Sequence, residues 1–264
     1  MRTPYVTAKN RVLDRATRWL RPLQRALDEA DSPVDFFFRD DDVGWDDSRL
    51  FELLDVFAAR SLPLDLAVIP LELTEKRADA LCERVASGPG SIDFHQHGFS
   101  HLNHESTGRK YEFGPSRPKW LQERDILEGR KRLEDLLGPS VAPIFTPPWN
   151  RCTSITAQCL AELEFEVLSR EWRAMPFGLE GLAELPIRVD WFAHRKRVRL
   201  DRDELGALIG EAARSGGPVG LMFHHAPMNR DELAGAGDLL DVLAQHPNAS
   251  ACSMRMLAGA TERK

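Results

Sequence analysis

The sequence predicts an α/β fold in a single domain. Short apolar runs alternate with stretches that carry apolar residues at helical spacing, which is the pattern of βαβ units around a parallel sheet. A length of 264 residues fits one barrel-sized domain, and no linker rich in Gly, Ser or Pro divides the chain. Acidic and histidine-rich motifs follow directly after several predicted strands, where α/β barrels carry their active sites.

The predicted elements follow in order along the chain. Apolar residues at helical spacing predict an amphipathic helix over 9–30, so we assign 1–32 to a helical extension and 33–264 to the barrel. The predicted strands cover residues 35–38, 64–69, 91–94, 143–145, 165–168, 185–189, 218–223 and 249–254. The predicted helices cover 48–60, 74–86, 120–137, a stretch between 149 and 165, and 231–244. The loop 104–118 is long for a βα connection, and loops of this length are often functional.

Composition narrows the range of partners. The net charge is −6 and no long basic run occurs, so nucleic acid is not an expected partner. No run of about eighteen apolar residues predicts a transmembrane helix. No apolar segment follows the first ten residues, so we expect a cytoplasmic protein. The four cysteines, Cys82, Cys152, Cys159 and Cys252, form no CxxC pair, and we expect them to be reduced thiols.

Four of the eight histidines lie between His95 and His104, and this cluster indicates a metal site or proton-transfer chemistry. His95 and His97 are two residues apart, so a strand would place them on one side. His97 and His101 are four apart, which predicts a helical turn that carries both on one face. A polar loop is the competing interpretation. The functional one is favoured because Asp40–Asp42 and His224–His225 also follow predicted strands.

One aspartate and two histidines make a three-ligand site, typical of Zn²⁺ and compatible with Co²⁺, Mn²⁺ or Ni²⁺. Such an ion lowers the pKa of a bound water and polarises a carbonyl oxygen. A second carboxylate would act as general base, and a histidine across the pocket would act as general acid. Taken alone, the acids predict an Asp-rich turn with Gly44, and His224–His225 equally predict a buried hydrogen-bonded pair.

Over residues 35–228 these motifs resemble the polysaccharide deacetylases with a NodB-homology domain, carbohydrate esterase family four, and most closely a branch of surface-polysaccharide biosynthesis. The resemblance implies a distorted (β/α)₇ barrel and metal-dependent removal of acetyl groups from sugars. Asp41-Asp42-Val43-Gly44 resembles the opening Asp-Asp-Gly element, which implies Asp41 as base and Asp42 as metal ligand. Asp40 leaves this register open by one residue. The segment from His97 to His101 resembles the His-x-x-x-His element of two further metal ligands.

The remaining motifs of the family appear in order. The segment from Thr146 to Trp149 resembles its Arg-Pro-Pro-aromatic element, with threonine in place of the arginine that orients the base; Arg39, Arg151 or Arg188 are the alternatives for that role. Asp190-Trp191 resembles the element whose aspartate acts through this arginine. The segment from Leu221 to His225 resembles the closing Leu-x-His element, which implies His224 as the acid, with His225 as second choice.

Aromatic and charged residues near these motifs complete the predicted site. We expect Trp149 and Trp191, with Pro148 and Asn150, to contact the sugar or the acetyl methyl group, although one tryptophan is as readily a core residue. Lys110, Glu112 and Arg117 of the long loop are candidates for sugar or phosphate contacts. His95, His104 or Asp93 are candidates to hold the second nitrogen of a ligand histidine.

The leading functional prediction is a metal-dependent hydrolase that removes an acetyl group from an N-acetylated sugar or polysaccharide precursor. A backbone N–H near Trp149 would help to stabilise the oxyanion. The alternatives are a non-catalytic carbohydrate-binding protein on the same barrel and an amidohydrolase of a non-sugar amide.

Overall fold

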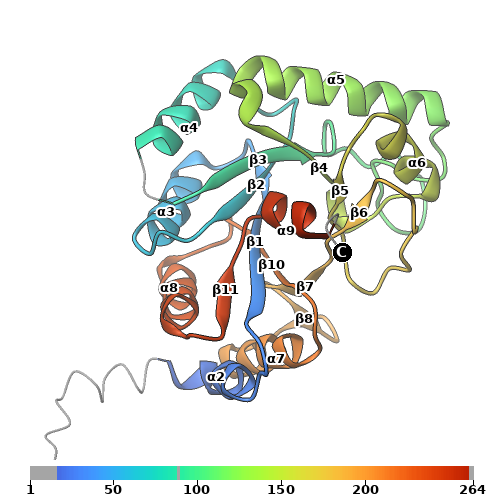
Figure 1. Cartoon of the computed structure of the whole chain (residues 1–264). Helices are drawn as coiled ribbons and strands as arrows, with labels where there is room; N and C mark the ends of the chain where they lie inside the picture. Colours follow the sequence, from blue (N-terminus) through green and yellow to red (C-terminus); the bar gives the residue numbers. More distant parts are fainter. Residues whose placement is uncertain (1–16, 88–89, 262–264) are drawn as a thin grey trace, which may run out of the picture.

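A curled parallel sheet forms the centre of the structure, a computed structural model that describes residues 17–87 and 90–261 (Figure 1). Its strands are β1 (Val34–Val43), β2 (Leu64–Val68), β3 (Ile92–His97), β4 (Val141–Thr146), β5 (Val167–Leu168), β6 (Ala183–Glu184), β7 (Ile187–Asp190), β10 (Val219–His224) and β11 (Ala249–Ala251). Their order is β6-β5-β4-β3-β2-β1-β10-β7, with β11 paired to β1. Backbone hydrogen bonds between Ile187 and residues 170 and 172 draw the two edges together. The predicted α/β fold, a distorted (β/α)₇ barrel, is confirmed.

Helices surround the sheet. They are α2 (Arg21–Asp28), α3 (Asp47–Ala58), α4 (Glu75–Ser87), α5 (Lys119–Leu137), α6 (Ser154–Glu162), α7 (Arg202–Arg214), α8 (Arg230–Gln245) and α9 (Met254–Thr261), with short 3₁₀ turns at Arg18–Leu20, Gly138–Ser140 and Pro148–Asn150. A small hairpin of β8 (His194–Arg195) and β9 (Val198–Arg199) precedes α7. None of the helices in the described ranges is long and apolar enough to cross a membrane.

Strand β1 shows how the sequence alternates between two environments. Phe36 and Phe38 belong to the buried cluster that includes residues of α3 and α8. Phe37 faces the barrel interior, where it packs with Met222 of β10 and Met254 of α9. In Figure 1, α9 lies in the middle of the ring of strands, so it closes the barrel at one end. Because side chains alternate along a strand, Arg39 and Asp41 share the interior side with Phe37.

Three predictions of secondary structure need correction. The segment 249–254 is not one strand, because β11 ends at Ala251 and Met254 begins α9. The predicted helix over 9–30 appears as a 3₁₀ turn followed by α2, and residues 9–16 lie outside the described part. Helix α7, which was not predicted, packs on α2; a Cβ atom at Gly206 would collide with the Trp19 carbonyl, so close helix packing explains its glycines.

The domain boundary that the sequence predicts between residues 32 and 33 stays a prediction. The four cysteines are all unpaired thiols.

Candidate active site

Asp42, His97 and His101 converge at the carboxyl ends of β1 and β3. Asp42 Oδ1 lies 3.2 Å from His97 Nε2 and 3.2 Å from His101 Nε2, and the potential ligand atoms of the three residues lie within 4.8 Å of one another. Asp42 has a φ of 66° and His101 a φ of 57°, so the backbone turns sharply at both residues. The structure therefore brings together the three residues predicted as metal ligands.

The predicted helical turn from His97 to His101 is wrong, and a loop brings the two rings together instead. Gly98 has a φ of 60°, which reverses the chain after β3. The buried Glu112 carboxylate then accepts hydrogen bonds from the backbone N–H groups of Phe99 (3.1 Å) and Ser100 (2.6 Å). Glu112 therefore holds the loop that carries His101.

The segment at Thr146 orients two histidines. His97 Nδ1 lies 3.1 Å from the Thr146 carbonyl oxygen, which can only accept, so this nitrogen carries a proton and leaves the Nε2 lone pair free. His95 Nε2 lies 3.0 Å from the Thr146 hydroxyl. Burial and the nearby Arg39 charge lower the pKa of His95 to about 3, so this histidine is neutral. The partner of the His97 ring is thus none of His95, His104 or Asp93.

Arg39 holds Asp41 in a buried, two-pronged ion pair. Arg39 Nε lies 2.7 Å from Asp41 Oδ1, and Nη2 lies 2.9 Å from Oδ2. The guanidinium also donates to the Ser169 hydroxyl at 2.7 Å and to Asn150 Oδ1 at 2.6 Å. Burial raises the pKa of Asp41, but the charges of Arg39, His97 and His224 together outweigh it, and the pKa lies below the usual value. Of the three arginines considered for the tether, the structure brings Arg39 to Asp41.

Asp190 does not make the predicted contact with the arginine that holds Asp41. Its Oδ1 accepts a hydrogen bond of 2.8 Å from the Phe192 N–H, and Ser169 and Asn150 support Arg39 in its stead. Burial raises the pKa of Asp190, while the Phe192 N–H and the charge of His224 oppose the rise. Asp190 therefore lies within electrostatic reach of His224. Arg188, by contrast, donates to Ser215.

His224 and His225 point in opposite directions from the end of β10. The His224 side chain is 30% exposed, and its Nε2 lies 3.9 Å from Asp42 Oδ2. The His225 ring is fully buried, with Nδ1 2.6 Å from Asp40 Oδ2 and Nε2 2.6 Å from the Trp45 carbonyl. Both His225 nitrogens are therefore occupied. The same contacts place Asp40 with His225, which leaves Asp41 and Asp42 as the acids of the site.

The Asp40–His225 pair is charged. Burial lowers the pKa of His225, but the Asp40 carboxylate and the Trp45 carbonyl outweigh it and raise the pKa to about 9. The contact of His225 with the Trp45 carbonyl holds the turn at Trp45, whose ring lies 5.0 Å from the His101 ring. Burial raises the pKa of Asp42, while hydrogen bonds with His101 and His97 bring it far below the usual value.

Two tryptophans border His101, but only one was predicted. The Trp149 ring lies 4.7 Å from the His101 ring, and Lys110 Nζ lies 5.7 Å from the Trp149 ring centre. Trp45 was missed, although its place one residue after Gly44 is a usable signal. Trp191 is a core residue, contrary to the prediction of substrate contact: it is buried against Trp19 and Phe223 and donates to Glu232.

The remaining predicted residues are divided between the site and its support. Pro148 is buried under the His97 loop, where a Cβ atom at Gly98 would come within 2.6 Å of the proline ring. Asn150 is half-buried and contacts Arg39. Arg117 is buried and pairs with Asp125 at 2.6 Å, so it is not a substrate contact. Lys110 alone of the three loop candidates lies beside the site.

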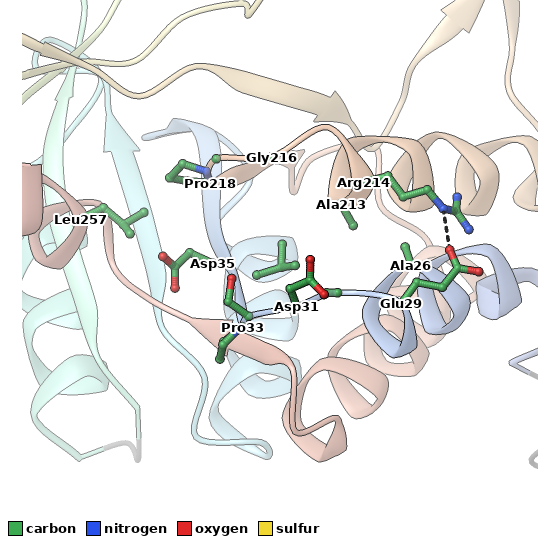
Figure 2. Close-up of a pocket in the computed structure, with 14 residues that line it drawn as sticks. Ala26, Glu29, Asp31, Pro33, Asp35, Ala213, Arg214, Gly216, Pro218 and Leu257 are labelled. Carbon is green, nitrogen blue, oxygen red and sulfur yellow. Dashed lines mark hydrogen bonds and ion pairs between the residues drawn. The ribbon is translucent and has the colours of Figure 1, made fainter.

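A cavity of about 870 Å³ lies at the end of the barrel opposite to the histidines (Figure 2). Its lining includes Asp35 at the start of β1, Pro218 before β10 and Leu257 of α9. An ion pair of 3.3 Å between Arg214 and Glu29 spans α7 and α2 beside it. Since the histidines lie at the carboxyl ends of the strands, this cavity is separate from the candidate active site.

No protein-family model and no curated protein sequence matches this chain. Solved structures do. A candidate polysaccharide deacetylase from Mycobacterium smegmatis aligns over 89% of this chain and 92% of its own, with 15% identity and a TM-score of 0.67. A family 4 acetyl xylan esterase from Clostridium thermocellum, in complex with a cobalt ion, aligns over 86% and 92%, with 13% identity and a TM-score of 0.57. A mutant CE4-family pseudoenzyme with restored enzymatic activity aligns over 86% and 68%, with 11% identity and a TM-score of 0.54.

These structures define the class to which the barrel is similar, that of polysaccharide deacetylases and family 4 esterases. The chain has the NodB-like fold of carbohydrate esterase family 4, as the motif order implied.

Proposed function

We propose that this protein is a metal-dependent carbohydrate deacetylase acting on an N-acetylated sugar or polysaccharide precursor. The observation that carries the proposal is the convergence of Asp42, His97 and His101 beside an ionised carboxylate, Asp41, and a partly exposed histidine, His224. A metal site, a base and an acid thus meet at the face where barrels of this kind perform chemistry.

The donor set fits a divalent cation. One carboxylate and two imidazole nitrogens suit Zn²⁺, with Co²⁺, Mn²⁺ or Ni²⁺ as alternatives. The hydrogen bond from His97 Nδ1 to the Thr146 carbonyl leaves Nε2 directed toward Asp42. When bound, the cation would supply Lewis-acid polarisation of the acetyl carbonyl.

Asp41 acts as the general base toward the attacking water. Arg39 uses one lone pair on each carboxylate oxygen, and a carboxylate has about four such sites, so Asp41 can still accept a proton. The ion pair with Arg39 also fixes the direction of the carboxylate. His224 donates a proton to the leaving nitrogen, and Trp149 with Trp45 forms the wall beside His101. We expect a backbone N–H of the Trp149 segment to stabilise the oxyanion.

The first test is bound metal per chain in protein purified without added metal. Wild type is expected to hold about one ion and the double variant Asp42→Ala, His97→Ala none. Acetate release from a panel of N- and O-acetylated sugars then tests the activity, which Asp41→Asn should abolish. Asp46→Asn, an exposed acid in the next turn, is the matched control. Absence of both metal and acetate release would contradict the proposal.

A non-catalytic sugar-binding protein is the second candidate, because a pseudoenzyme has the same fold and Thr146 replaces the arginine of the family motif. Bound metal and glycan affinity without turnover would favour it. Turnover of formamides or cyclic amides alone would favour an amidohydrolase of non-sugar substrates.

A further inference from the structure

A second pocket, of about 430 Å³, lies on the same face of the barrel as the candidate active site. It is lined by four arginines. Arg109 comes from the loop after β3, Arg151 from the segment after β4, and Arg170 and Arg173 from the segment after β5. The carboxyl ends of three neighbouring strands therefore direct cationic side chains into one place. Glu171 is the single carboxylate in the lining.

Three of these arginines have no carboxylate partner among the residues that the structure describes. Arg170 is buried and paired with Glu184 at 2.7 Å, so its charge is compensated. Within residues 17–87 and 90–261, Arg109, Arg151 and Arg173 form no ion pair, and the Nε of Arg151 is buried without a hydrogen-bond partner. Burial raises the pKa of the Cys152 thiol to about 12, so this lining residue is neutral. Positive charge is thus concentrated here in a chain whose net charge is −6.

The pocket adjoins the candidate active site through Asn150. This residue lines the pocket and accepts a 2.6 Å hydrogen bond from Arg39, the partner of Asp41. The preceding residue, Trp149, contacts His101 and lies under Lys110. A substrate that reaches from the catalytic groups past Asn150 therefore enters a basic pocket. Guanidinium groups bind phosphate and carboxylate oxygens through paired hydrogen bonds, and a cleft concentrates their field.

We propose that Arg109, Arg151 and Arg173 bind an anionic group of the substrate, either a phosphoryl group that links the acetylated sugar to a carrier or a carboxylate of the sugar itself. This inference rests on the proposed deacetylase function and specifies its substrate as an anionic sugar. It also explains why an unpartnered guanidinium nitrogen is tolerated at Arg151, since a ligand oxygen would satisfy it.

The test is calorimetric titration of the full chain with three probes: inorganic pyrophosphate, glucuronate and glucose. We expect pyrophosphate or glucuronate to bind, glucose not to bind, and the affinity to fall as salt rises. Arg151→Gln and Arg173→Gln should each weaken binding of the anion about tenfold, the scale of one lost charge-assisted hydrogen bond. Pyrophosphate binding would identify a phosphoryl group, and glucuronate binding a sugar carboxylate.

Arg25→Gln is the matched control, because Arg25 is an exposed arginine on α2, away from this face. It should leave the dissociation constant unchanged. Arg173 is exposed, so its variant is expected to fold, and a thermal unfolding midpoint checks this. Failure of both anions to bind, or equal weakening by all three variants, would overturn the inference. The probes carry no acetyl group, so a negative acetate-release assay leaves this result standing, and the converse also holds.

Discussion

Arg39 and Asp41 lie two residues apart on β1, so they face the same side of the strand and meet in the barrel interior. A carboxylate held by an arginine of its own strand needs no arginine from β4, which accounts for Thr146 at that position. The Thr146 carbonyl and hydroxyl orient His97 and His95 instead. Thr146 stands where the family motif has an arginine, and Arg39 of β1 makes the contact with Asp41 instead.

Replacing Arg39 by Met should leave the buried Asp41 carboxylate without its counter-charge. Loss of one partner of a buried ion pair costs about 3–5 kcal/mol, so the free energy of unfolding should fall by that order. Chemical denaturation of the variant and of wild type measures it. Metal content should persist, because Asp42, His97 and His101 keep their positions. A variant as stable as wild type would contradict the assigned contact.

Substitution of His224 should affect the rate of acetate release, and substitution of His225 should affect stability. His224→Asn is expected to lower acetate release by at least about a hundredfold, the usual contribution of a general acid, with little change in stability. His225→Asn should instead lower the free energy of unfolding, because Asp40 loses a buried charged partner. Parallel measurements of rate and of unfolding free energy check both. A catalytic defect without destabilisation in His225→Asn would exchange the two assignments.

At the scale of elements, the loop from Gly98 to Pro118 positions His101, while Asp42, His97 and His224 lie on strands. The spacing of His97 and His101 correctly indicated that their rings meet, but the periodicity suggested a helix. The actual cause is non-local: Glu112, far along the loop, accepts two backbone N–H groups next to His101. Sequence periodicity detects local repeats, so it cannot reveal such a contact.

Glu112→Ala should therefore weaken metal binding although Glu112 is not a ligand. Loss of a partner that orients a ligand typically costs 10–100-fold in metal affinity, and we expect that range. Competition with a chromophoric chelator measures it. Glu105→Ala is the control, since Glu105 belongs to the same loop and its side chain accepts hydrogen bonds from Ser116, not from the residues next to His101. Equal effects of both variants would indicate general disturbance of the loop.

Strand β2 and α9 meet at Asp65, whose Oδ2 accepts a 3.0 Å hydrogen bond from the Met254 N–H while Oδ1 has no partner within the described chain. Burial raises the pKa of Asp65 well above 3.8. The unfolded chain therefore loses this proton first, and the group destabilises the fold increasingly as pH rises above about 4 until the raised pKa is passed.

Asp65→Asn removes this titration while it keeps an oxygen for Met254. The free energy of unfolding of the variant, relative to wild type, should increase with pH above about 4 and show no gain at lower pH. Urea titrations at several pH values measure it. Asp79→Asn, at an exposed position of α4, should show no such trend. A gain independent of pH would contradict a protonated Asp65.

At the scale of the whole molecule, the strands β1, β2, β3, β4, β7 and β10 were predictable because each contains a short apolar run. The fold and the meeting of the motifs followed from them. Helix α7 was missed because it contains Gly206 and Gly210, which lower helix propensity but allow close contact with Trp19 and with Pro22 of α2. The placement of Trp191 depended on packing by Trp19, a tertiary contact that no motif contains.

Metal should stabilise the entire fold, because the proposed ligands come from β1, from β3 and from the loop after β3. At a free Zn²⁺ concentration one hundred times the dissociation constant, linkage predicts about 2.7 kcal/mol of added stability. Thermal unfolding with and without Zn²⁺ measures the shift. His101→Ala should abolish it, while His104→Ala, an exposed neighbour, should retain it. An equal shift in both variants would indicate binding elsewhere.

Because β1 pairs with β10, the candidate active site can form only after a late segment of the chain has been synthesised. Asp41 and His224 are register partners on adjacent strands, although one lies early and the other late in the sequence. On the ribosome, a nascent chain exposes one edge of β1 until β10 has been made, because β2 covers only the other edge. Contacts between such distant residues also slow folding. A chain that stops before β10 would therefore keep an unpaired edge on β1 and would lack His224, so we expect it to aggregate and to be without the proposed acid.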